Sequence, residues 1–317
     1  IYNFLFDITS NNYLYFRLIN DVILFFISVI LFFTAQEIKN SKSIYKSFIS
    51  STLFILLVSK VWYISEFSEL YSLFFISLSF LIFYLYKNSN NKYIFIGLFL
   101  SIASLINQGS ILFLLPFIII SITNKRRLLV TKNFFYLSTS FLSLHLIFIF
   151  IYLFSGILEI YLANYITIPL GYTGESISSL YELRVWSRGF YDHDRFLYFG
   201  LLTLIISYIL SNIQKSYKFL FIFNNSFLVI SLSIYFIGSH NYYHHLFYFL
   251  YFLPFTYLYI KDNKYQLVSS IFILLASISI IINSTLPAYE NLKSTENTYN
   301  NYPLYQLSQE IDSKFDT

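Results

Sequence analysis

Three short stretches of this largely apolar chain carry acidic, basic or imidazole side chains that could do chemistry. Glu66 and Glu69 lie where one apolar run ends and the next begins, residues 181–195 carry three arginines among acids, and residues 239–245 carry three histidines. A charged group inside a bilayer costs several kcal/mol and usually faces a cavity or a partner. The candidate substrate-binding residues are therefore Glu66, Glu69, Arg184, Arg188, Asp192, Asp194, His240, His244 and His245.

The arginines favour an anionic ligand, because a guanidinium group binds phosphate in a bidentate manner. Arg184 and Arg188 would hold a lipid-linked phosphate at the membrane surface. Salt bridges to Glu182, Asp192 and Asp194 within the same loop are the alternative. Glu66 and Glu69 would either position a sugar or acceptor or belong to a solvated rim.

His240 and His244 are four residues apart and would share one helix face, whereas the adjacent His244 and His245 would point about 100° apart. A histidine pair with nearby carboxylates can bind zinc, but the spacing fixes no third ligand. We therefore predict no cofactor and keep a divalent metal as an alternative. His145 stands alone inside an apolar run, where a hydrogen bond between packed helices is the expected role.

A fourth polar site interrupts the apolar pattern at Asn107-Gln108-Gly109. It separates two short runs, so these form either a tight helix pair or a broken helix. Such a break is tolerated where protein or water receives the freed backbone groups.

Composition defines the elements that must position these side chains. Of 317 residues, 57% are hydrophobic and 11% charged, whereas soluble domains carry roughly 25% charged residues. This excludes a water-soluble globule, and the absence of cysteine excludes disulfides, zinc–thiolate and iron–sulfur sites. The chain predicts an all-α polytopic membrane protein with about ten transmembrane helices, not a barrel. The apolar runs are 13–36, 48–64, 69–86, 93–107, 109–123, 133–155, 196–213, 219–237, 243–260 and 265–283.

Loop charges predict the orientation of these runs. Alternate loops hold 13 of the 20 lysines and arginines, and the positive-inside rule places them in the cytoplasm. These loops are 37–47, 87–92, 124–132, 214–218 and 261–264. Both ends of the chain and the long loop 156–195, which would carry short helices, then lie outside the cytoplasm. The candidate binding residues all fall on this outer side.

Several stretches, in order, resemble the GT-C superfamily of membrane glycosyltransferases, which includes protein O-mannosyltransferases and lipid A aminoarabinose transferases (families 39 and 83). They are Asn12-Tyr13-Leu14-Tyr15-Phe16-Arg17-Leu18-Ile19-Asn20, Ser65-Glu66-Phe67-Ser68-Glu69-Leu70-Tyr71, Ile96 to Gly109 followed by Leu114-Leu115-Pro116, and Tyr243-His244-His245-Leu246 followed by Leu253-Pro254-Phe255. Family members often carry Lys where Asn107 stands, and a Tyr at one of the two His positions. The resemblance covers most of 1–283.

The resemblance implies an inverting transfer of a hexose or pentose from a polyprenyl-phosphate donor to an acceptor hydroxyl, at the outer face of the bacterial inner membrane. The acceptor would be a glycan, a lipid or a protein, and no nucleic acid is involved. The family's general-base Asp lies in an outer loop that this alignment places before Ile1. We therefore expect a fragment, inactive by itself, in which 1–283 form the transmembrane domain and 284–317 begin an extracytoplasmic segment.

Two other classes remain open. An O-antigen polymerase or ligase would also carry arginines and histidine in a large outer loop, as 156–195 does. A transporter would show two related halves with helices broken near the midplane, and no such internal repeat is evident. An acidic pair about 30–50 residues before Ile1, after one more span, would favour the glycosyltransferase.

Overall fold

The computed structural model describes residues 13–38, 44–58, 68–122, 127–167, 218–237 and 247–258. Within these ranges the regular elements are all helices, as the all-α prediction requires. The α-helices are α2 (Tyr13–Ile38), α3 (Ile44–Val58), α4 (Ser68–Leu85), α5 (Lys92–Ile106), α6 (Leu114–Ile122), α7 (Arg127–Phe154), α8 (Leu158–Leu162), α12 (Lys218–Ile237) and α13 (Phe247–Leu258). A 3₁₀ segment, η1 (Gln108–Phe113), precedes α6, and a π-helical turn, η2 (Ala163–Thr167), follows α8.

Eight of the ten apolar runs coincide with these helices, and the runs 196–213 and 265–283 lie outside the described residues. Three helical stretches are long and apolar enough to cross a membrane: Leu18–Ile38, Ser68–Leu85 and Lys132–Phe154. The remaining apolar helices in the described ranges are shorter. The structure therefore supports membrane-spanning helices, while the count of ten spans stays a prediction.

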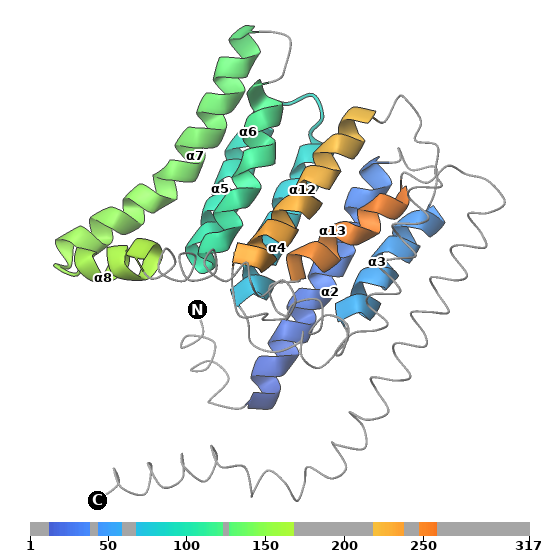
Figure 1. Ribbon diagram of the computed structural model, residues 1–317, viewed down its shortest axis with the longest axis horizontal. Coiled ribbons are helices and arrows are strands. Elements are labelled where there is room, and N and C mark those ends of the chain that lie inside the picture. The colour runs from blue at the N-terminus through green and yellow to red at the C-terminus, as the bar shows by residue number, and fades with distance from the viewer. Residues whose placement is uncertain are drawn as a thin grey trace, which may run out of the picture.

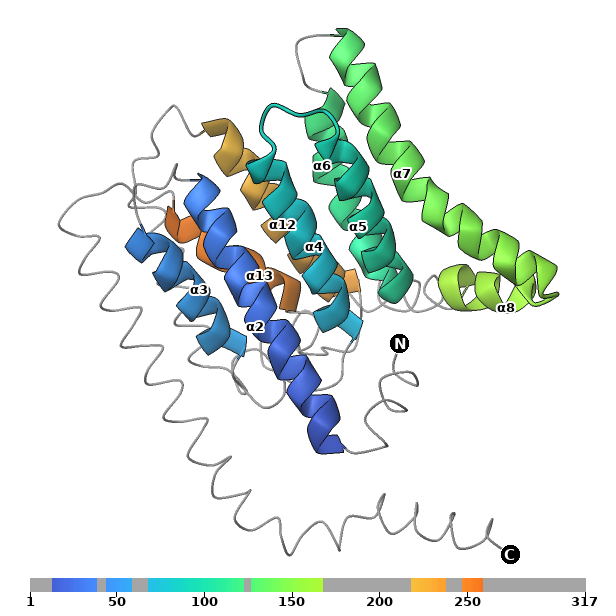
Figure 2. The same ribbon diagram turned by 180° about the vertical axis from the view of Figure 1, so that it is seen from behind.

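The helices pack in two layers (Figures 1 and 2). One layer is a row of neighbours in the order α3, α2, α4, α5 and α7. The helices α13, α12 and α6 lie across this row, with α12 touching both α13 and α6. Because α4 packs on α5 and the sequence-distant α13 packs on α3 and α4, residues near 70, 107 and 248 come together.

The bundle has two chemically different ends. At one end, Lys87 Nζ in the loop between α4 and α5 lies 3.2 Å from Glu37 Oε2 near the end of α2. We call this the Lys87 end, and the opposite end, where α4 begins, the Glu69 end. The loop 87–92, one of those predicted to be cytoplasmic, lies at the Lys87 end, and the side of a membrane that this end faces stays a prediction.

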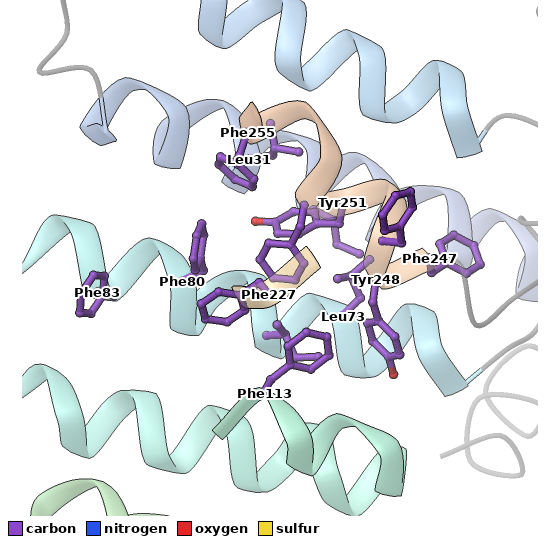
Figure 3. Packing of buried hydrophobic residues seen from close by; sticks show 14 of the residues in the cluster. Leu31, Leu73, Phe80, Phe83, Phe113, Phe227, Phe247, Tyr248, Tyr251 and Phe255 are labelled. Carbon is purple, nitrogen blue, oxygen red and sulfur yellow. The ribbon is translucent and has the colours of Figure 1, made fainter. Parts of the chain in front are cut away.

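The core is a cluster of aromatic rings (Figure 3). Phe80 of α4 is fully buried, with its ring centroid 4.9 Å from that of Phe227 in α12 and 5.3 Å from that of Phe252 in α13. Most of these pairs meet edge to face, the geometry that aromatic quadrupoles prefer. In the described residues, these buried rings join α4, α12 and α13.

Helices α5 and α7 approach each other closely at Gly97. A Cβ atom on Gly97 would lie 2.0 Å from Ser140 Oγ and 2.6 Å from the backbone oxygen of Leu137. Small residues let membrane helices approach so closely. From this contact α7 leans away from α5 towards the end that carries α8 (Figures 1 and 2).

Candidate polar site at the Glu69 end

Glu69 lies in the first turn of α4, and only 3% of its surface is exposed. A carboxylate is favoured at a helix N-terminus, where backbone N–H groups carry partial positive charge. The burial excludes the solvated rim that the sequence left open for this residue. Glu69 is therefore part of a buried polar cluster.

Asn107 supplies an amide donor to this carboxylate. Its Nδ2 donates to Glu69 Oε1 at 2.9 Å and to Ser68 Oγ at 3.1 Å, and the Ser68 hydroxyl lies within 3.3 Å of Glu69 Oε2 as a donor. Two of the polar sites found in the sequence, at Glu69 and at Asn107, thus meet in space. The carboxylate is held from two helices.

The break at Asn107 is a tight helix pair with its backbone groups satisfied internally. Asn107 adopts an extended conformation and its N–H donates to the oxygen of Ala103 at 2.9 Å. Its own carbonyl accepts from the N–H of Ser110 at 3.0 Å and from the Ser110 hydroxyl at 2.7 Å. The predicted break is therefore confirmed, and the N–H and C=O groups of Asn107 both bond to protein groups.

Tyr248 of α13 joins the same cluster. Its hydroxyl oxygen lies 2.5 Å from Ser72 Oγ, and the Ser72 hydroxyl also lies 3.1 Å from the backbone oxygen of Glu69. Tyr248 is fully buried against Phe113, with ring centroids 5.2 Å apart (Figure 3). The sequence did not single out Tyr248, although it follows His244 by four residues.

A second buried pair lies beside it on α4. The Tyr71 hydroxyl donates to Asn20 Oδ1 of α2 at 2.5 Å, and Asn20 is fully buried. An asparagine inside an apolar run is a signal for such an interhelical bond. Asn20 ended one of the stretches that carry the family resemblance, yet its role was not foreseen.

His145 makes the hydrogen bond expected of it. Its Nε2 lies 2.9 Å from Ser104 Oγ, linking α7 to α5. Tyr165 of η2 reaches the same place, because its hydroxyl donates to the backbone oxygen of Ser104 at 2.8 Å. Burial raises the pKa of Tyr165 to about 12, with a smaller increase from Tyr161 and an opposing effect of the hydrogen bond to Ser104.

A cavity of about 480 Å³ opens beside this contact, between α5, α7 and the segment formed by α8 and η2. We call it the α5–α7 cavity. Its polar lining residues are Gln108, Tyr152, Tyr161 and Tyr165, and its apolar ones are Ile102, Leu105, Ile106, Leu144, Phe148 and Ile160. Such volumes are typical of sites for small or lipid-like ligands.

The other predicted binding residues, namely Glu66, Arg184, Arg188, Asp192, Asp194, His240, His244 and His245, lie outside the described residues. Their roles and the loop 168–195 stay predictions. In the part of the chain that the structure describes, no group of three or more His, Asp or Glu residues is placed to hold a metal ion. Glu69 is the one predicted residue whose surroundings are defined.

Comparisons of this chain with protein-family models, with curated proteins and with solved structures found no match. In the described part of the chain, the fold and the site define an all-helical protein with helices long and apolar enough to cross a membrane and a buried polar cluster around Glu69 at one end of its bundle.

Proposed function

We propose that the chain is a membrane glycosyltransferase that moves a sugar from a polyprenyl-phosphate donor to an acceptor hydroxyl on the extracytoplasmic face. The observation that carries the proposal is the buried Glu69 carboxylate at one end of a helical bundle. It is supported by the resemblance of four stretches to GT-C enzymes. One of those stretches contains Glu69 and another contains Asn107.

Glu69 suits a substrate-positioning role because burying a carboxylate is costly. An ionisable group within a membrane helix is a functional candidate once its partner is named, and here the partner is the Asn107 amide. An ionised carboxylate offers about four acceptor sites. Asn107 and Ser68 both donate to it, and the hydroxyl groups of a sugar are donors of the same kind.

The remaining roles follow from the chemistry of the transfer. Arg184 and Arg188 bind the donor phosphate, which is the leaving group, and His240, His244 and His245 help to position sugar or acceptor. The acceptor hydroxyl loses its proton to a carboxylate base and attacks the anomeric carbon from the side opposite the phosphate. The configuration at that carbon is therefore inverted.

Donor binding tests the proposal without requiring turnover. The purified chain, reconstituted in lipid nanodiscs, is titrated with polyprenyl phosphate and with the same lipid carrying mannose, glucose or aminoarabinose. We expect saturable binding of at least one sugar lipid, weakened when Arg184 and Arg188 are both replaced by Ala. The absence of binding to any of these lipids would overturn the proposal.

Reconstitution of the same chain in nanodiscs and in sealed liposomes separates the alternatives. A polymerase or ligase would prefer a diphosphate-linked oligosaccharide lipid over a monophosphate-linked monosaccharide. A transporter would take up a soluble solute into sealed liposomes. Either result, in place of monophosphate sugar-lipid binding, contradicts the glycosyltransferase.

A further inference from the structure

The α5–α7 cavity has polar residues at the Glu69 end of the bundle and mainly apolar residues deeper along α5 and α7. The hydroxyl of Tyr165, which lines one side, is bonded to the oxygen of Ser104. Gln108 at the start of η1 and Tyr152 near the end of α7 lie towards the Glu69 end of the bundle. Ile102 and Leu144 lie one to two turns deeper along the two helices. A ligand that fits this gradient has a polar head near the helix ends and an apolar tail directed into the bundle.

The length of the cavity matches one leaflet of a bilayer. Its lining on α7 extends from Leu144 to Tyr152, which is about 12 Å at 1.5 Å per residue. Half of a hydrocarbon core of about 30 Å is roughly 15 Å. The cavity therefore suits an ordinary acyl chain, whereas a polyprenyl chain is considerably longer.

The cavity is continuous with the apolar outer surface of α7. Phe148 and Ile160 line it and are also 39% and 55% exposed. Exposed apolar side chains continue along α7 at Leu146 and Phe150. In a membrane protein such a surface contacts lipid, so a chain can enter the cavity sideways from the bilayer.

The inner wall of the cavity is firmly held. The rings of Tyr161 and Tyr165 are stacked at 5.4 Å, and the ring of Tyr152 lies 5.0 Å from that of Tyr161. Tyr165 is tied to α5 through the oxygen of Ser104. These contacts close the side of the cavity that faces α8. This wall is therefore already ordered before a ligand binds.

We propose that the α5–α7 cavity binds one acyl chain of a membrane phospholipid, with the headgroup region near Gln108 and Tyr152. The site is separate from the Glu69 cluster and does not depend on the glycosyltransferase proposal. The lipid fills the space left where α7 leans away from α5 and so stabilises that end of the bundle.

The test compares Leu144→Trp, which fills the cavity, with Leu146→Trp, which adds the same side chain to the exposed face of α7. Each chain is purified in detergent, washed, and examined by native mass spectrometry with palmitoyl-oleoyl phosphatidylethanolamine or phosphatidylglycerol as the probe. We expect one lipid to stay bound to the parent chain and to Leu146→Trp, and at least tenfold less to Leu144→Trp. Adding the phospholipid should raise the unfolding temperature of the parent chain and of Leu146→Trp, but not that of Leu144→Trp.

Leu105→Trp fills the same cavity from α5, and circular dichroism checks that each variant keeps its helix content. If Leu144→Trp does not fold, Leu105→Trp should lose the lipid in its place. Equal lipid retention by the filled and control variants would overturn the proposal. Retention of polyprenyl phosphate in preference to phospholipid would also overturn it. The same holds if the parent chain retains no lipid and another segment of the chain can be cross-linked into the cavity.

Discussion

The Asn107 side-chain amide donates to the Glu69 carboxylate at 2.9 Å. This bond ties the break between α5 and η1 to the first turn of α4, so the same residue interrupts one helix and holds the acid of another. The polar break and the buried acid are one structural unit.

A double-mutant cycle should measure this coupling. Asn107→Ala removes the donor to a buried carboxylate, and hydrogen bonds to charged groups contribute about 1.5–3 kcal/mol. Unfolding in detergent should show this loss in the parent chain but a loss of less than about 1 kcal/mol in a Glu69→Gln background. Equal losses in the two backgrounds would mean that the amide and the carboxylate are not coupled.

Gly97→Ala should weaken the packing of α5 on α7. The new methyl group would meet Ser140 Oγ and the Leu137 oxygen, and overpacking costs about 1–3 kcal/mol. Adding Ser140→Ala removes only the first clash, so the double variant should stay destabilised. Ser101→Ala, on the same helix, is the control and should be neutral or stabilising, because its buried hydroxyl oxygen has no hydrogen-bond partner. An unchanged unfolding temperature for Gly97→Ala would show that the two helices are not this close.

His145 should be the tautomer protonated at Nε2. The Ser104 hydroxyl donates to the oxygen of Ser101 at 2.9 Å, so it accepts from His145. Nitrogen NMR of labelled histidine checks the tautomer, and His145→Leu should cost about 0.6–1.7 kcal/mol, as interhelical hydrogen bonds in membranes do. Thr139→Ala, whose hydroxyl bonds only to its own helix, should cost less. A proton on Nδ1 instead would contradict this assignment.

The Tyr165 phenol should lose its proton at a higher pH than an ordinary tyrosine. Its folded pKa of about 12 lies above the ordinary 10.0, so the neutral phenol stabilises the docking of η2 fully below pH 10. That contribution is lost as the pH rises from 10 to about 12. The difference in tyrosinate absorbance between the parent chain and Tyr165→Phe isolates this residue. A difference curve centred near pH 10 would show that the phenol is not buried in the folded chain.

Periodicity and composition were enough to locate most of the described helices, because apolar runs of membrane length have few other structures open to them. They also indicated the break at Asn107 and the hydrogen bond of His145. They did not reveal that Asn107 would face Glu69, because that contact depends on how α4 packs against α5. Nor did they reveal Tyr248, since a tyrosine in a chain with 31 of them carries no signal until its neighbours are known.

The central claim is that Glu69 positions the sugar of a polyprenyl-phosphate donor. The direct measurement is the Kd of nanodisc-embedded parent chain and Glu69→Gln for the preferred sugar lipid and for polyprenyl phosphate without sugar. Gln keeps the acceptor for Asn107 but removes the charge, so loss of a charged hydrogen bond should weaken sugar-lipid binding about 10- to 150-fold and leave binding of the sugar-free lipid unchanged. Equal affinities of the two proteins for the sugar lipid, or equal weakening for both lipids, would contradict the claim.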